Sequence, residues 1–172
     1  MVAKSPHMTD RLKIALAQMN QRVGDLEGNG AAMLEMRRKA KGADLLVCPE
    51  LQLIGYPPED LVLKPEFVRR AHECLDGLVA ATTEPGPAIL IGAPVAEGGV
   101  VYNAMILANE GRVLARTLKH ELPNYGTFDE KRIFTPGPLP EPIDFKGVKI
   151  GVPSAMVSPG SSRRLAFSDL KM

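Results

Sequence analysis

Cysteine is scarce in this chain, tryptophan is absent, and the positive and negative charges nearly balance. These features exclude several classes of protein. Only two cysteines, Cys48 and Cys74, occur in 172 residues, and they predict neither a disulfide framework nor a metal site. Lys plus Arg number 21 against 20 Asp plus Glu, which gives no electrostatic reason to expect a nucleic-acid or membrane partner. No apolar run is long enough to span a bilayer, and residues 1–7 lack the apolar segment of a signal peptide. We therefore expect a cytoplasmic protein with reduced thiols.

Short apolar runs alternate with helical patterns, which predicts a layered α/β fold. In the first helical pattern Met33 and Met36 share an apolar face, and Arg37 lies on another. The proline- and glycine-bearing stretch 120–142 is expected to be a long loop. The expected strands are residues 12–17, 45–48, 88–92, 100–108, 113–117 and 148–152, and the expected helices are residues 29–41 and 65–78.

Two charged residues follow expected strands at positions where chemistry is common. Glu50 comes just past a buried strand, where α/β folds often place ligands. Lys119 ends the second strand of the predicted hairpin and is expected to point into the same layer as Glu50. Each has a simpler interpretation when taken alone: a solvated turn glutamate and an edge-strand lysine. His120 is a third candidate, as a base or as an ordinary loop histidine.

Three segments resemble motifs of the nitrilase (carbon–nitrogen hydrolase) superfamily in their sequences and in their order along the chain. Members of this superfamily use a Glu–Lys–Cys triad. Glu50 lies in a motif that matches the family's glutamate motif, and Lys119 in one that matches its lysine motif. The loops 55–61 and 122–134 further resemble the glutaminase domain of NAD synthetases. The three segments are Val47-Cys48-Pro49-Glu50-Leu51, Gly55-Tyr56-Pro57-Pro58-Glu59-Asp60-Leu61, and the run from Lys119-His120-Glu121-Leu122 through Asn124-Tyr125-Gly126 to Asp129-Glu130.

The resemblance implies a role for three residues. Glu50 would be the general base, Lys119 would stabilise the oxyanion formed from the glutamine amide, and Tyr125 would line the glutamine pocket. It implies glutamine as substrate, no nucleic-acid or membrane partner, and no metal or cofactor in this part of the protein. ATP and magnesium would belong to a synthetase domain, which 172 residues cannot also hold. Intact members of the superfamily form homo-oligomers through their outer helices.

The sequence departs from the family pattern at the nucleophile. Ala155 stands where the family has its catalytic cysteine, and Ser154 would point the other way from an extended segment. Cys48 shares a strand face with Glu50, but a buried strand cysteine is more often inert packing. We therefore expect this chain to be inactive alone.

The implied fold is an α-β-β-α sandwich that is incomplete at its C-terminus. Residues 10–153 would form the partial glutaminase domain, 1–9 a disordered extension and 154–172 a non-homologous tail. Two other functions remain open: a general carbon–nitrogen hydrolase acting on another small amide, and a non-catalytic remnant that binds an intact subunit.

Overall fold

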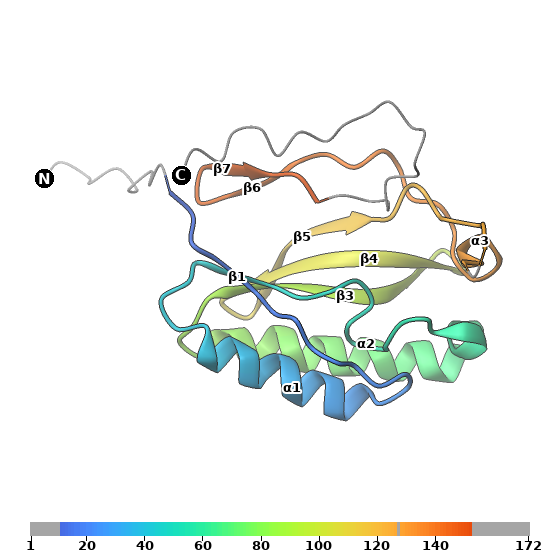
Figure 1. Ribbon diagram of the computed structural model, residues 1–172, viewed down its shortest axis with the longest axis horizontal. Coiled ribbons are helices and arrows are strands. Elements are labelled where there is room, and N and C mark those ends of the chain that lie inside the picture. Colours follow the sequence, from blue (N-terminus) through green and yellow to red (C-terminus); the bar gives the residue numbers. More distant parts are fainter. Residues whose placement is uncertain (1–10, 127, 153–172) are drawn as a thin grey trace, which may run out of the picture.

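The computed structural model describes residues 11–126 and 128–152, and its centre is one mixed five-stranded sheet (Figure 1). The strand order is β1-β2-β3-β4-β5, with β1, β2 and β3 parallel and β3, β4 and β5 antiparallel. The predicted α/β class is therefore confirmed. The strands are β1 (Ile14–Leu16), β2 (Leu45–Val47), β3 (Ala88–Glu97), β4 (Val100–Asn109) and β5 (Arg112–Leu118).

Two helices supply the crossover connections that parallel strands require, and both lie on the same face of the sheet (Figure 1). Helix α1 (Leu26–Lys39) joins β1 to β2, and its N-terminus is capped by the carboxylate of Asp25. The 3₁₀ turn η1 (Glu59–Leu63), helix α2 (Pro65–Ala80) and the 3₁₀ turn η2 (Ala81–Thr83) join β2 to β3. Proline opens α2 because the first turn of a helix needs no backbone donor at that position.

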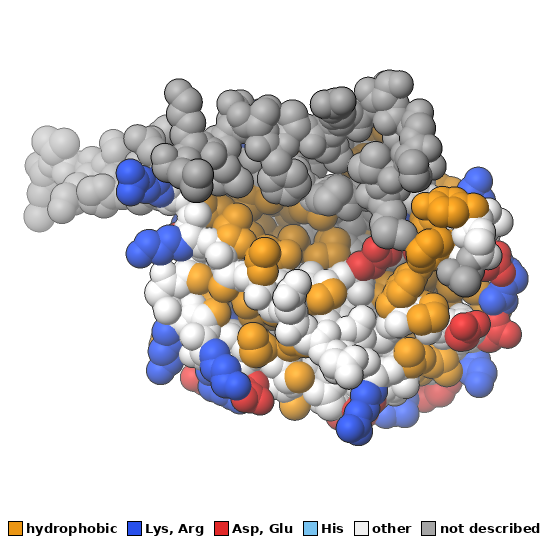
Figure 2. Space-filling model, in the orientation of Figure 1, with side chains coloured by type: hydrophobic (Ala, Val, Ile, Leu, Met, Phe, Trp, Pro, Cys, Tyr) orange, Lys and Arg blue, Asp and Glu red, His pale blue; other side chains and the backbone are white. Residues whose placement is uncertain are grey.

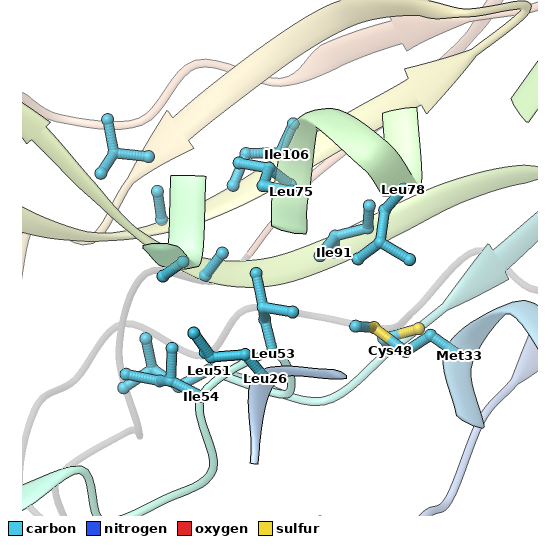
Figure 3. Close-up of a cluster of buried hydrophobic side chains, with 14 of the residues drawn as sticks. Leu26, Met33, Cys48, Leu51, Leu53, Ile54, Leu75, Leu78, Ile91 and Ile106 are labelled. Atoms are coloured by element: carbon cyan, nitrogen blue, oxygen red, sulfur yellow. The ribbon is translucent and has the colours of Figure 1, made fainter. Parts of the chain in front are cut away.

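Alternate residues of β3 supply two separate hydrophobic clusters, one on each face of the sheet. Ile89 and Ile91 point toward α1 and α2, where they join the larger cluster. Figure 3 shows part of it, with Met33 and Cys48 next to each other and Leu78 near Ile91. Leu90 faces the other side and packs with the smaller cluster, which includes residues of a two-stranded sheet. That sheet consists of β6 (Ile143–Phe145) and β7 (Val148–Ile150).

Several predicted boundaries were wrong, each for a local reason. Helix α1 begins at Leu26, three residues before the predicted start, because the Asp25 cap precedes two glycines that weakened the helical pattern. Strand β3 continues to Glu97, since its last residues pair with β4 as a long hairpin. The stretch 120–142 contains a short helix, α3 (Glu130–Ile133), and strand β6 begins at Ile143, directly after this stretch.

Arg37, which the helical pattern places on a different face from Met33 and Met36, is buried. Its guanidinium donates hydrogen bonds to the carbonyl oxygens of Pro87 at 2.8 Å and Glu84 at 2.9 Å. It also donates to the carbonyl oxygens of Ala81 and Thr82, which lie just past the end of α2. The side chain thus supplies hydrogen bonds to the backbone of the segment that connects α2 to β3, a role that helical periodicity does not reveal.

Within residues 11–126 and 128–152 no helix is long and apolar enough to cross a membrane. Figure 2 shows hydrophobic side chains across the middle of one face and charged side chains along its edges. The predicted extension 1–9 and the predicted tail 154–172 lie outside the described residues, so the domain boundaries stay predictions.

Candidate functional site

The turn that follows β2 holds Glu50 in place. Leu51 has a positive φ of 48°, which bends the chain back sharply after Glu50. The amide of Leu53 donates to the carbonyl oxygen of Gly92 at 3.1 Å, and the buried side chain of Asn29 donates to the carbonyl oxygen of Leu53 at 3.1 Å. The turn is therefore fixed to β3 on one side and to α1 on the other.

Gly92 allows this turn to pack directly on the sheet. A Cβ at Gly92 would lie 2.4 Å from the carbonyl oxygen of Pro49 and 2.5 Å from the amide nitrogen of Leu51. Both neighbours are backbone atoms, which cannot move aside as a flexible side chain would. A glycine at this point of β3 thus lets Glu50 approach the centre of the sheet.

Glu50 and Lys119 meet, as the sequence predicted. Lys119 follows β5, and its Nζ donates to Oε1 of Glu50 at 2.6 Å. The lysine is buried, whereas 38% of the Glu50 side chain is exposed. The pair therefore combines a fixed cation with a carboxylate that a ligand can reach.

Glu130 is a third member of this cluster and was not assigned a role from the sequence. It opens α3 and is buried, and both of its carboxylate oxygens accept from Nζ of Lys119, Oε1 at 3.0 Å and Oε2 at 2.8 Å. The hydroxyl of Tyr56 donates to Oε1 of Glu130 at 3.0 Å. A carboxylate with so little exposure needs such donors, because burying an unpaired charge is costly.

Asn103 is a fourth member and links the two residues predicted from the sequence. Its side-chain Nδ2 donates to Oε1 of Glu50 at 2.5 Å, and its backbone carbonyl accepts from the amide of Lys119 at 2.8 Å. Asn103 is buried in β4, the neighbour of β5, which ends just before Lys119. Both donors to Glu50 reach the same oxygen, so Oε2 is the oxygen that faces away from them.

The charges of the cluster determine what it can do. Two carboxylates, Glu50 and Glu130, share one ammonium, Lys119. Burial raises the pKa of Tyr56 well above its usual range, and the neighbouring charge of Glu130 raises it further. Tyr56 thus remains a protonated donor at any ordinary pH. An exposed carboxylate oxygen beside a buried cation can accept a proton from one group and stabilise negative charge on another.

Tyr125, the third predicted site residue, lies on the loop before α3. Its side chain is largely exposed, and its ring makes an edge-to-face contact with Phe128, with 5.5 Å between ring centroids. The Nδ1 of His120 lies 2.7 Å from the carbonyl oxygen of Gly137. Ala155 and Ser154 lie outside the described residues.

Neither cysteine has the surroundings of a nucleophile. Cys48 is buried in the larger hydrophobic cluster, among the residues labelled in Figure 3. Burial raises the pKa of its thiol to about 12, so that almost none is thiolate at neutral pH. The pKa of Cys74 is also raised by burial, and its Sγ contacts the carbonyl oxygen of Leu26. In the described part of the chain no cluster of three His, Cys, Asp or Glu residues could hold a metal ion.

A separate open hollow of about 680 Å³ lies beside α2 and α3. Its walls include Val68, His72, Val100 and Phe134, and neither Glu50 nor Lys119 lines it. His72 Nε2 accepts a hydrogen bond from the amide of Ala96 at 3.1 Å. The hollow is therefore distinct from the Glu50–Lys119 cluster.

The mixed α/β sheet carries a carboxylate–lysine cluster where its strands β2 and β5 end, and this combination points to a class of protein. The carbon–nitrogen hydrolase family matches residues 13–154, and the chain belongs to this family. The chain matches the N-terminal part of glutamine-dependent NAD synthetases and spans about a quarter of their length.

Individual relatives narrow the resemblance. A glutamine-dependent NAD(+) synthetase of Rhodobacter capsulatus is 44% identical over 148 residues, which cover 85% of this chain and 27% of that protein. The structure of such a synthetase from Acinetobacter baumannii has a TM-score of 0.74 at 35% identity, over 80% of this chain and 26% of that one. An amidase from a Nesterenkonia species has a TM-score of 0.67 at 31% identity, over 80% of this chain and 53% of its own.

Proposed function

We propose that this chain carries the acid–base half of a glutaminase site, which in its relatives supplies ammonia for the synthesis of NAD. The observation that carries the proposal is the contact of 2.6 Å between Lys119 and Glu50, in a chain whose relatives are named glutamine-dependent NAD synthetases. Glutamine would be the substrate, and glutamate and ammonia the products.

Glu50 acts as the general base in this proposal. Its Oε1 is held by Lys119 and Asn103, which leaves Oε2 to take the proton of an attacking thiol. The partial exposure of Glu50 allows a nucleophile and a substrate to reach it. In the next step the protonated carboxyl group returns the proton to the departing ammonia, and water then hydrolyses the remaining thioester to glutamate and the free thiol.

Lys119 stabilises the oxyanion that forms when the thiolate attacks the side-chain amide of glutamine. The ammonium is buried and held by Glu50 and Glu130, so it needs little reorganisation when negative charge develops nearby. Tyr125, on the exposed loop before α3, would line the pocket for the glutamine side chain.

The proposal predicts that the native chain is inactive alone. An amidase of Nesterenkonia carries a covalent acetamide on its active-site cysteine. Here Ala155 stands where the family resemblance places that cysteine, and Cys48 is buried with a raised pKa. Loss of a covalent nucleophile typically costs on the order of a millionfold in rate.

The remaining parts of the proposal follow from the relatives. ATP, magnesium and the amidation of deamido-NAD would belong to a synthetase domain of the longer proteins. The sheet and its two helices would be one half of an α-β-β-α sandwich, with β6 and β7 beginning the second sheet. Hydrolysis of another small amide is the second candidate, because the Nesterenkonia amidase shares the fold over most of this chain.

Release of glutamate and ammonia from glutamine tests the proposal, with acetamide as the competing substrate. The native chain should give no turnover with either. The variant Ala155→Cys tests whether the nucleophile is the only missing group, and any activity it gains should favour glutamine and disappear when Glu50→Gln is added. Activity that survives Glu50→Gln would contradict the role of Glu50. Native turnover that Glu50→Gln abolishes would contradict the predicted inactivity and implicate Cys48.

A further inference from the structure

The open hollow beside α2 and α3 has an apolar floor, formed by the buried side chains of Val68, Ile133 and Phe134. Two further apolar residues line it and remain in contact with water: Leu63 is 51% exposed and Val100 is 38% exposed. The volume of about 680 Å³ falls within the range of small-molecule sites. Because covering apolar surface is favourable in water, the floor would stabilise an apolar ligand body.

The ionisable residues that line the hollow are all basic: Arg69, His72, Lys131 and Arg132. Each arginine is already paired with two carboxylates, Arg69 with those of Glu66 and Glu73 and Arg132 with those of Asp60 and Asp129. Among residues 11–126 and 128–152 no carboxylate pairs with Lys131, whose side chain is exposed. The hollow therefore presents one ammonium that complements an anion.

His72 supplies a second donor to the hollow. Its Nε2 accepts a hydrogen bond from the amide of Ala96 at 3.1 Å, so this nitrogen carries no proton. The proton of the neutral imidazole is then on Nδ1. Within the described part of the chain no acceptor lies within hydrogen-bond distance of Nδ1. The Nδ1–H group can therefore serve an oxygen of a ligand.

The surroundings of the hollow favour a small ligand over a protein partner. The ion pairs of Arg69 and Arg132 are formed by exposed side chains that flank the hollow, so the apolar surface does not extend far beyond its rim. A stable protein–protein interface buries about 1,200 Å² or more and has an apolar centre. A short apolar body with one acidic group matches the hollow better than such an interface does.

We propose that this hollow binds a small carboxylate with an apolar body, of the class of medium-chain fatty acids. The apolar chain lies on the floor, and the carboxylate accepts from the ammonium of Lys131 and from Nδ1–H of His72. The site is separate from the glutaminase proposal, because neither Glu50 nor Lys119 lines the hollow. Either proposal can therefore fail without the other.

Titration of the chain, labelled with ¹³C in its methyl groups, with octanoate tests the proposal by nuclear magnetic resonance. The methyl signals of Val68 and Val100 should shift and saturate. Those of Leu16, which is exposed on β1 and does not line the hollow, should not move. Octylammonium has the same chain with the opposite charge and octanol has no charge, so each should bind roughly threefold more weakly or worse. Shifts of similar size at Leu16, equal binding of octylammonium, or no saturable shift up to about 10 mM octanoate would overturn the proposal.

Two variants test which residues hold the ligand. Val100→Glu places a carboxylate at the rim and should weaken octanoate binding roughly tenfold, because like charges repel. Its matched control is Val113→Glu, since Val113 is also an exposed strand valine but does not line the hollow, and binding should stay unchanged. Lys131→Gln should weaken octanoate binding roughly threefold and leave octanol binding unchanged. Octanoate binding that ignores both Val100→Glu and Lys131→Gln, or that falls equally in Val113→Glu, would contradict the assigned site.

Discussion

Replacing Gln52 with methionine should stabilise the protein, although most substitutions of buried residues destabilise. Gln52 follows Glu50 in the turn after β2, and its side chain is completely buried. In the described structure neither its amide nitrogen nor its amide oxygen has a hydrogen-bond partner. Folding therefore removes this amide from water without returning its hydrogen bonds, which costs about 1–3 kcal/mol.

Methionine matches the length and flexibility of glutamine and carries no group that needs a hydrogen bond. Gln52→Met should raise the free energy of unfolding by about 1–3 kcal/mol. For a domain of this size, each kcal/mol corresponds to a rise in Tm of roughly 2–4 °C. Urea unfolding measures the free energy directly, and thermal unfolding provides an independent measurement.

The control is Gln18→Met, because Gln18 is exposed and its substitution should change stability by less than about 0.5 kcal/mol. A loss of 1 kcal/mol or more in Gln52→Met, with Gln18→Met unchanged, would refute the reasoning. It would show that the buried amide has a partner, such as an internal water molecule, which the substitution removes.

Three further predictions concern other parts of the molecule. Gly92→Ala should lower the free energy of unfolding by about 2–3 kcal/mol, because the new Cβ meets the backbone of the Glu50 turn. The control is Gly77→Ala in α2, where a Cβ meets no atom, and this change should raise the free energy of unfolding by about 0.5–1 kcal/mol in the same urea titration. Arg37→Met should cost about 3 kcal/mol in urea unfolding, because the carbonyl oxygens that Arg37 serves lose their donor; an effect below about 1 kcal/mol would mean that water replaces it. Cys74 should react with a thiol reagent before Cys48 at pH 8. In the variant Cys74→Ser the rate at which the reagent modifies Cys48 should rise about tenfold per pH unit, because burial raises the pKa of Cys48 to about 12. A plateau of this rate below pH 9 would contradict the prediction.

The sequence predicts the elements with strong patterns and misses those that depend on distant contacts. Strand β3 is evident because it is a long apolar run of residues that favour strands. The hairpin of β4 and β5 is evident because two such runs flank a turn that contains a glycine. Strand β6 has only three residues and follows a proline-rich stretch, so nothing local marks it. Its partner β7 is what makes it a strand.

The site shows the same division. Glu50 and Lys119 could be singled out because each follows a recognisable strand within a motif that resembles a known family. Asn103 lies inside β4 and looks like any polar strand residue, and its two contacts exist only once the strands are paired. Glu130 lies in the quoted motif, but its burial against Lys119 depends on the path of the loop before α3. The signal for Asn103 is a polar residue in an otherwise apolar strand, whereas Glu130 lies in a run of charged residues that does not single it out.

The central claim is that Lys119 contacts both Glu50 and Glu130. The side-chain nitrogen of Lys119 is the most direct probe of these contacts. Nuclear magnetic resonance of the ¹⁵N-labelled chain should show a slowly exchanging ammonium signal that Lys119→Met removes, because three carboxylate contacts protect its protons from water. Glu130→Gln should shift this signal and speed its exchange. A Lys119 ammonium that exchanges as fast as those of exposed lysines, or that ignores Glu130→Gln, would contradict the cluster and the chemistry proposed for it.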